Sequence, residues 1–198
     1  VTITAPQVLA PIATVDDVNC FGESDGWVVL TTTGGTGFYT YNWNPNTFSN
    51  SNAVGLPIGT YNATVTDAND CAVSLSAIVN QPTQLTASIQ ATDATCTLPN
   101  GSASIFGVSG GTPGYDYLWS NGETSALATG LSPTDHSAAV TDVMGCSVVL
   151  TVTVIDQAGP TINGIIVTNP NCFGDCDGTA TASVSGGTTP FVYHWNDI

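Results

Sequence analysis

The sequence predicts an all-β protein made of tandem antiparallel sandwich or barrel repeats of about 76 residues. A short aromatic segment occurs three times, and its tryptophans, Trp43, Trp119 and Trp195, follow each other at intervals of 76 residues. A fixed long period of this kind is the signature of a repeat array. The chain is also rich in Thr, Ser, Val and Gly, and no segment keeps a helical period, so strands and turns are expected throughout.

The first half of repeat 1 is expected to contain three strands separated by turns. Residues 9–15 form the first strand, and residues 20–26 form a turn that ends in Asp-Gly. Residues 27–33 are rich in Val and Thr, which favour strands. A Gly-Gly-Thr turn at residues 34–36 then leads into the aromatic strand at residues 38–43.

The second half of repeat 1 is expected to begin with a polar loop at residues 44–52. Residues 61–67 alternate apolar and polar side chains with a period of two, as a half-buried strand does. After a tight turn, residues 71–79 form a closing strand. Repeat 2 has matching strands at residues 102–108, 115–119, 137–141 and 147–154.

Segments that recur with the same period set the repeat boundaries. We interpret residues 1–6 as the closing strand of a preceding repeat, because they alternate and end in proline like the joint before Pro82. Repeat 1 then covers residues 7–82, repeat 2 covers 83–158, and residues 159–198 are the first half of repeat 3. We expect repeat 3 to have an open core, and we expect the same polypeptide or a neighbouring chain to complete it.

The charge composition excludes several partners. The chain has 15 Asp and Glu but no Lys or Arg, which gives a formal net charge of −15. Nucleic-acid binding by phosphate neutralisation is therefore excluded, and so is a basic membrane patch. No run of apolar residues is long enough to span a membrane. We expect repulsion between copies unless cations screen it.

The six cysteines indicate an oxidising compartment if they pair. Because the separations within the two complete repeats are nearly equal, we predict the disulfides Cys20–Cys71 and Cys96–Cys146. Cys172 should pair with a cysteine beyond residue 198. Metal ligation is the alternative, but two thiols per repeat without a nearby His cannot complete a zinc site. Cys176 has no counterpart and is expected to be unpaired or bonded to another chain.

Two interpretations of the aromatic segment remain open. Large rings at alternate positions of a strand share one face, and we favour a role in the core of each repeat. The alternative is an exposed platform for sugars, alone or with the polar loop at residues 44–52. The core assignment covers Tyr39, Tyr41, Trp43, Tyr115, Tyr117, Trp119, Phe191, Tyr193 and Trp195.

A combination of motifs carries a family resemblance. Cys-Phe-Gly-x-x-Asp-Gly occurs at Cys20–Gly26, Gly-Gly-Thr with Tyr-x-Tyr-x-Trp at Gly34–Trp43, and Thr-Val-Thr-Asp-Ala-Asn-x-Cys at Thr64–Cys71. Repeat 3 matches the first two, whereas Cys96–Gly101 of repeat 2 is one residue shorter and lacks Phe-Gly. The chain thus resembles the SprB-type repeats of giant surface adhesins from gliding Bacteroidota. The resemblance implies immunoglobulin-like sandwiches that are secreted and displayed at the cell surface, and it carries no catalytic residues.

Neither catalysis nor a metal site is strongly indicated. Gly107–Gly111 matches the nucleophile-elbow pattern, but a further turn and strand are expected there instead of a helix. No acid, base or nucleophile recurs between repeats, so we do not expect an enzyme or a cofactor. Calcium is a weaker alternative, since carboxylate oxygens suit it. The candidates are Asp16, Asp17, Asp25, Asp175 and Asp177, for which we favour roles in turns.

These observations predict a structural or adhesive segment of an extracellular adhesin, stalk or filament. The expected partners are neighbouring repeats of the same or identical chains. The alternative is a glycan-binding module of a secreted protein, with surface glycans as its partners.

Overall fold

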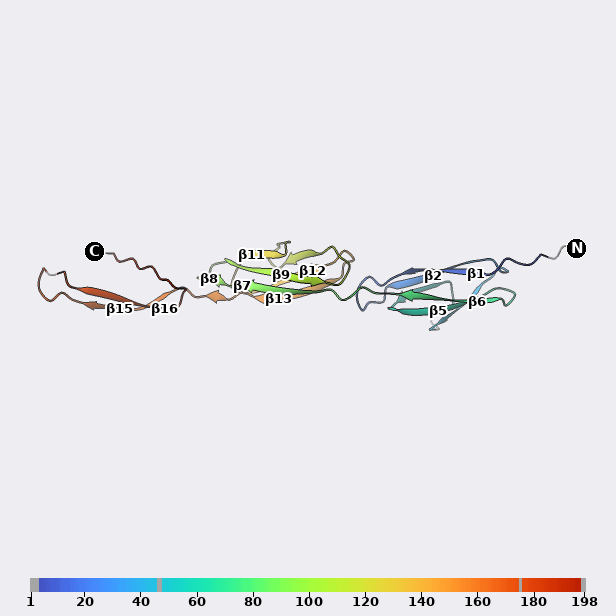
Figure 1. Ribbon diagram of the computed structural model, residues 1–198, viewed down its shortest axis with the longest axis horizontal. Coiled ribbons are helices and arrows are strands. Elements are labelled where there is room, and N and C mark those ends of the chain that lie inside the picture. The colour runs from blue at the N-terminus through green and yellow to red at the C-terminus, as the bar shows by residue number, and fades with distance from the viewer. Residues whose placement is uncertain (1–3, 46–47, 175, 197–198) are drawn as a thin grey trace. The chain divides into compact units, whose positions relative to one another are not determined.

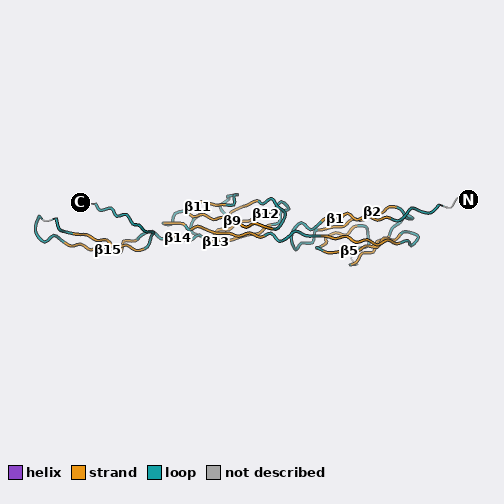
Figure 2. The backbone as a smooth tube through the Cα atoms, viewed as in Figure 1, coloured by secondary structure: helices purple, strands orange, loops and turns teal. Residues whose placement is uncertain are grey.

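The computed structural model describes residues 4–45, 48–174 and 176–196. Every regular element in these residues is a β-strand, which confirms the all-β prediction (Figures 1 and 2). In that part of the chain, no helix is long and apolar enough to cross a membrane. The backbone forms two compact units. Unit 1 comprises Val1–Ala87, Gly107–Asp116 and Val140–Val148, and unit 2 comprises Ser88–Phe106, Tyr117–Ala139 and Val149–Ile198.

Repeat 1 contains two three-stranded antiparallel sheets. The first has the order β1-β2-β4, with β1 at Ala10–Asp16, β2 at Gly26–Thr33 and β4 at Asn52–Leu56. The second has the order β3-β5-β6, with β3 at Thr40–Asn44, β5 at Gly59–Thr66 and β6 at Ala72–Val79. These orders correspond to the A-B-E and C-F-G sheets of an immunoglobulin domain. The repeats are immunoglobulin-like β-sandwiches.

The core of repeat 1 lies between its two sheets. Side chains of β2 and β5 alternate, so that every second residue faces inward. Trp43 on β3 is 1% exposed and lies in the position of the buried tryptophan of immunoglobulin strand C. The buried cluster also contains Val28, Leu30, Ala53, Leu56, Tyr61, Ala63, Val65, Ala77 and Val79.

Strands β3 and β4 run in the same direction, although they are consecutive. β3 starts beside Thr66 and ends beside Asn62 of β5, whereas β4 runs from the level of Val29 to that of Gly26 on β2. The chain therefore changes sheets between them without reversing. As a consequence, the β1–β2 loop and the β5–β6 turn lie at opposite ends of the sandwich.

A hydrogen bond closes the corner before β5 in repeat 1 and the equivalent corner in repeat 2. The hydroxyl of Tyr61 donates to the carbonyl oxygen of Pro57 over 2.9 Å, as in the tyrosine corner of immunoglobulin folds. In repeat 2, Nε2 of His136 lies 2.9 Å from the carbonyl oxygen of Ser132. His136 therefore takes the place of the corner tyrosine, a role that the sequence analysis did not find.

Repeat 2 has the same strand order as repeat 1. One sheet has the order β11-β9-β7, and the other has the order β10-β12-β13. A short parallel pair, β8 with β14, accompanies them. The bounds are β7 Thr86–Thr92, β8 Ala94–Thr95, β9 Gly101–Ser109, β10 Asp116–Trp119, β11 Leu127–Leu131, β12 Asp135–Thr141, β13 Ser147–Thr153 and β14 Asp156–Gln157. Within unit 2, the buried residues of this repeat are Ala94, Ala103, Ile105, Trp119, Ala128, Leu131, Ala138 and Val154.

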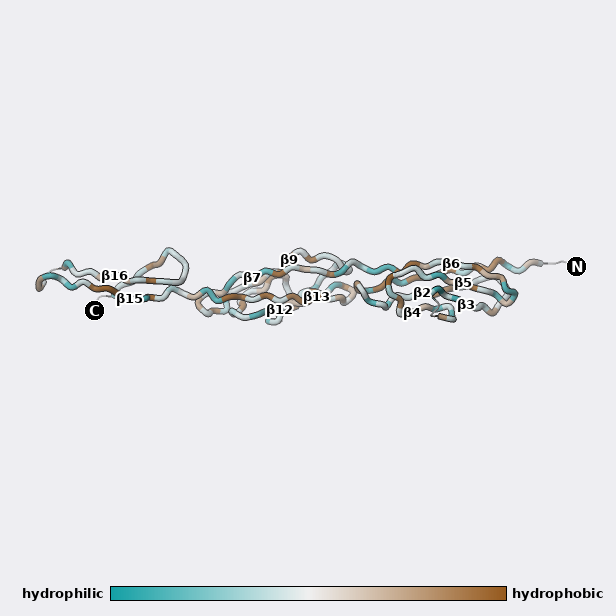
Figure 3. Tube along the Cα trace, turned by 90° about the horizontal axis from the view of Figure 1, so that it is seen from below, coloured by the Kyte–Doolittle hydropathy of each residue, from teal (hydrophilic) through white to brown (hydrophobic). Residues whose placement is uncertain are grey.

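Repeat 3 consists of one hairpin and an aromatic segment without strand structure. β15 at Thr161–Thr168 pairs with β16 at Thr179–Ser185. β15 contains apolar residues (Figure 3), and of these Ile162, Ile165, Ile166 and Val167 are exposed. Tyr193 and Trp195 are 49% and 53% exposed, so the structure does not bury these two residues of the predicted core. The described part of repeat 3 has no strands equivalent to β4, β5 and β6 to cover them. The hairpin and the aromatic segment line an apolar groove of about 450 Å³.

The proposed closing strand at residues 1–6 is only partly within the described residues. Residues 1–3 lie outside the described residues, and residues 4–6 have no regular structure.

Candidate functional site

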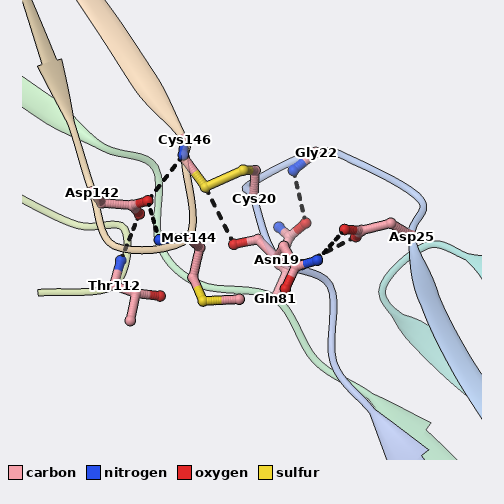
Figure 4. Close-up of a disulfide and its surroundings, with 9 residues drawn as sticks. All are labelled: Asn19, Cys20, Gly22, Asp25, Gln81, Thr112, Asp142, Met144 and Cys146. Carbon is pink, nitrogen blue, oxygen red and sulfur yellow. Dashed lines mark hydrogen bonds between the residues drawn. A yellow bond between two sulfur atoms is a disulfide. The ribbon is translucent and has the colours of Figure 1, made fainter.

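A disulfide bond joins Cys20 of repeat 1 to Cys146 of repeat 2, within unit 1 (Figure 4). The predicted pairs Cys20–Cys71 and Cys96–Cys146 are therefore wrong. Cys71 and Cys96 are exposed thiols, as are Cys172 and Cys176.

The strand topology explains why Cys20 cannot reach Cys71. The loop with Cys20 lies at the Val79 end of β6, because the N–H of Val18 donates to the carbonyl oxygen of Asn80 over 2.9 Å. Cys71 lies at the other end, immediately before Ala72 begins β6. The eight residues of β6 span about 25 Å, whereas a disulfide needs Cα atoms within about 7 Å.

The turn that carries Cys146 is organised by one buried carboxylate. Asp142 accepts hydrogen bonds from the backbone N–H groups of Thr112 at 2.8 Å, Met144 at 2.9 Å and Cys146 at 2.9 Å (Figure 4). Burial raises the pKa of Asp142, but these N–H donors outweigh that effect and hold the pKa below its ordinary value. We call Asp142–Cys146 the second-cysteine turn of repeat 2.

The loop that carries Cys20 is fixed from both sides. The N–H of Asn19 donates to Oδ1 of Asp25 over 3.0 Å, and the N–H of Gly22 donates to Oε1 of Gln81 over 3.0 Å (Figure 4). Sγ of Cys146 lies 3.3 Å from the carbonyl oxygen of Asn19. We call Asn19–Asp25 the first-cysteine loop of repeat 1.

The Gly-Gly-Thr turns lie against the chain that enters each complete repeat. Gly34 and Gly110 have φ values of +71° and +78°, which favour glycine. A Cβ atom at Gly34 would lie 1.9 Å from the carbonyl oxygen of Val8, and one at Gly110 would lie 1.9 Å from that of Gln84. These glycines are therefore required by a close approach of two backbone segments.

The aromatic segments of the two complete repeats are packing residues. Trp43 and Trp119 are 1% and 2% exposed, and each indole N–H donates over 2.8 Å to a backbone carbonyl, that of Asn50 or Ser125. The ring of Phe48 packs against the indole ring of Trp43 in an edge-to-face arrangement. Tyr39, Tyr41, Tyr115 and Tyr117 are half-buried, and so is Phe191 of repeat 3. In repeats 1 and 2, neither tryptophan presents a ring face to a sugar.

The calcium candidates that the structure describes serve as acceptors in loops or lie at a strand end. Asp25 and Asp177 accept the N–H groups of Asn19 and Asn171, and Asp17 accepts that of Asn80. Asp16 ends β1. Asp175 lies outside the described residues. Among those that are described, no group of three or more His, Cys, Asp or Glu side chains could hold a metal ion.

The nucleophile-elbow pattern does not form an elbow. Ser109 ends strand β9 and is followed by the Gly110 turn. Its hydroxyl oxygen lies 3.0 Å from that of Thr86. Ser109 therefore has the environment of a strand-end residue and does not sit on a strand-to-helix turn.

Comparisons with known proteins agree with the internal period. A family model described as the SprB repeat matches residues 12–48, 88–124 and 164–198, which together make up more than half of the chain. A search of curated proteins finds no match. Among solved structures, the amphioxus IgVJ-C2 molecule is similar at 10% identity and a TM-score of 0.29, over 72% of this chain and 96% of that chain.

Proposed function

Because this chain belongs to the SprB repeat family, we propose that it is a structural segment of an extracellular, surface-displayed adhesin, stalk or filament. The observation that carries the proposal is the disulfide between Cys20 of repeat 1 and Cys146 of repeat 2. A bond between successive repeats limits how far the chain extends under tension. Structural disulfides persist in oxidising, extracellular surroundings, which supports the proposed location.

The composition fits a role outside the cell. The sequence has no Lys or Arg, so trypsin-like proteases have no side chain to recognise. The net charge of −15 opposes non-specific association between copies. The proposal includes a role in gliding motility, because the chain resembles repeats of adhesins from gliding Bacteroidota.

Stretching the single molecule between its termini tests the mechanical role. The disulfide closes a loop of 126 residues, so roughly 420–450 Å of the contour length of the oxidised chain should not extend under force. A reducing agent should release that length, and the Cys146→Ser variant should extend fully without it. If the oxidised wild-type chain extends as far as the variant, the disulfide bears no load and the proposal fails.

The alternative function, glycan binding, has less support because Trp43 and Trp119 are buried. A glycan array with the full chain would separate the two functions. Binding that is lost in a folded Trp43→Ala variant would favour the glycan-binding module.

A further inference from the structure

We propose that the first cysteine of each repeat bonds the second cysteine of the next repeat, so that Cys71 and Cys96 are open halves of a recurring linkage. Cys71 would bond the first-cysteine loop of a SprB repeat that precedes repeat 1. Cys96 would bond the second-cysteine turn of a completed repeat 3. This inference goes beyond the proposed function, because it sets the pairing rule for a whole array and predicts the state of particular thiols.

Cys71 is presented in the same way as the bonded Cys146. Asp67 precedes Cys71 by four residues, as Asp142 precedes Cys146. Oδ1 of Asp67 accepts the N–H groups of Asn69 at 2.9 Å and Cys71 at 3.0 Å. Its Oδ2 accepts the N–H of Thr36 at 2.8 Å.

The turns also agree in their backbone hydrogen bonds. The N–H of Asp67 donates to the carbonyl oxygen of Cys71 over 3.0 Å, and the N–H of Asp142 donates to that of Cys146 over 2.9 Å. Asp67–Cys71 is therefore the second-cysteine turn of repeat 1. It is complete in structure, but its thiol is exposed and has no disulfide partner among the described residues.

Cys96 is presented in a loop closed like that of the bonded Cys20. The N–H of Thr95, the residue before Cys96, donates to Oδ1 of Asn100 over 2.8 Å. The N–H of Asn19 makes the equivalent bond to Asp25. The same contact recurs in repeat 3 between Asn171 and Asp177, beside Cys172.

The joint to the end of the repeat holds Cys96 as well. Its N–H donates to the carbonyl oxygen of Gln157 over 3.1 Å, and the N–H of Thr97 donates to Oδ1 of Asp156 over 2.9 Å. In repeat 1, Gly22 is held in a related way by the side chain of Gln81. The first-cysteine loop of repeat 2 is thus closed by the same kinds of contact, although in its shorter sequence Cys96 and Thr97 have positive φ values of +55° and +60°, unlike Cys20.

Pairing within a repeat is prevented by the same topology that separates Cys20 from Cys71. The first-cysteine loop and the second-cysteine turn lie at opposite ends of β6 in repeat 1, about 25 Å apart. The formed bond joins a first-cysteine loop to the second-cysteine turn of the following repeat. Cys96 lies in a first-cysteine loop and therefore needs the second-cysteine turn of the following repeat. Cys71 lies in a second-cysteine turn and therefore needs the first-cysteine loop of the preceding repeat.

Oxidised glutathione is a sufficient oxidant for the bond. A protein thiolate attacks one glutathione sulfur and releases one glutathione as thiolate, which takes up a proton from the solvent. The second protein thiolate then attacks the mixed disulfide and releases the second glutathione. Two protein thiols are oxidised to one disulfide, and one glutathione disulfide is reduced to two thiols.

The test completes repeat 3 on the full chain. A second copy of residues 47–82 is appended after residue 198, which continues the 76-residue period and supplies a copied Cys71. After oxidation with glutathione disulfide, free thiols are blocked with N-ethylmaleimide and disulfides are mapped by non-reducing mass spectrometry. We expect Cys96 to lose its reactivity and to be bonded to the copied cysteine, while the original Cys71 stays reactive. The matched control replaces the copied cysteine with serine, and Cys96 should then stay reactive.

An intact Cys20–Cys146 bond serves as the control that the chain is folded. In a chain that passes this control, two results would overturn the pairing rule. One is a bond between the copied cysteine and Cys172 of the same repeat. The other is a Cys96 that stays reactive beside the copied cysteine.

A second test needs no extension and keeps the rule falsifiable if the extended chain does not fold. In the Cys146→Ser variant of the full chain, the rule predicts that Cys20 becomes reactive and does not bond Cys71. The Cys71→Ser/Cys146→Ser double variant should show the same Cys20 reactivity. A Cys20–Cys71 bond in the single variant would refute the rule.

Discussion

Replacing Trp43 with alanine separates a core residue from a ligand platform. Trp43 is 1% exposed, so its truncation removes roughly 200 Å² of buried surface, worth about 5 kcal/mol at 25 cal/mol per Å². Measured Trp→Ala truncations in cores cost about 3–5 kcal/mol. The carbonyl of Asn50 loses its indole donor, but Asn50 is exposed and water can replace the bond. We therefore expect the variant to lose about 4 kcal/mol of unfolding free energy.

That loss is between about a third and the whole of the stability expected for one repeat of 76 residues, about 4–11 kcal/mol. The melting temperature of repeat 1 should fall by roughly 15–30 °C, which circular dichroism and urea titration would measure. Trp119→Ala should destabilise repeat 2 similarly, because Trp119 is 2% exposed. Trp195→Ala is the matched control: Trp195 is 53% exposed, and its loss should cost about 0.5 kcal/mol or less. A Trp43→Ala variant with unchanged stability would refute the core assignment.

Three further predictions concern acid, cations and reduction. The N–H groups of Thr36, Cys71 and Asn69 lower the pKa of Asp67 and outweigh the opposite effect of burial. The carboxylate therefore stabilises the fold at pH values above its pKa in the unfolded chain, which is about 3.9. That contribution is lost as pH falls through the lower folded pKa, so melting temperatures should drop below about pH 4 in wild type and less steeply in Asp67→Asn. Sodium chloride should raise the melting temperature at pH 7 because it screens 15 acidic groups, and magnesium should match calcium; a calcium-only rise that a chelator removes would show a specific site instead. Reduction of Cys20–Cys146, which closes 126 residues, should cost up to about 5 kcal/mol, as should Cys146→Ser. Cys71→Ser should have no effect, and an equal loss in that variant would contradict the bond assignment.

The sequence was most informative where side chains alternate. Residues 61–67 were predicted as a strand, and β5 covers Gly59–Thr66 with Tyr61, Ala63 and Val65 buried. β4 was missed because its alternation is broken. Only Ala53 and Leu56 of Asn52–Leu56 are buried, and Gly55 has a φ of +70° beside a register shift.

The wrong disulfides were predicted from the nearly equal separations of the cysteines along the sequence, without regard to strand direction. Strands that alternate in direction at residues 9–15, 27–33, 38–43, 61–67 and 71–79 already place the loop at residues 20–26 and the turn before Cys71 at opposite ends of the repeat. In the structure β3 and β4 run in the same direction, so the two cysteines of repeat 1 lie at opposite ends. The separation of cysteines along the sequence does not say which repeat supplies the partner of Cys20, because Cys71 and Cys146 occupy equivalent positions in their repeats.

The same turns show how a chain without cationic side chains stabilises buried charge. Asp67 and Asp142 are 5% and 4% exposed, and the sequence has no Lys or Arg to pair with them. A buried carboxylate is costly unless it is compensated, and here each one accepts backbone N–H groups from its own turn and from the Gly-Gly-Thr segment, at Thr36 or Thr112. Because every such bond fixes a backbone atom, satisfying the charge also fixes the turn. Cys71 lies in this turn without a disulfide and Cys146 lies in the same turn with one, so the turn itself positions the cysteine and is suited to a linkage that repeats along an array.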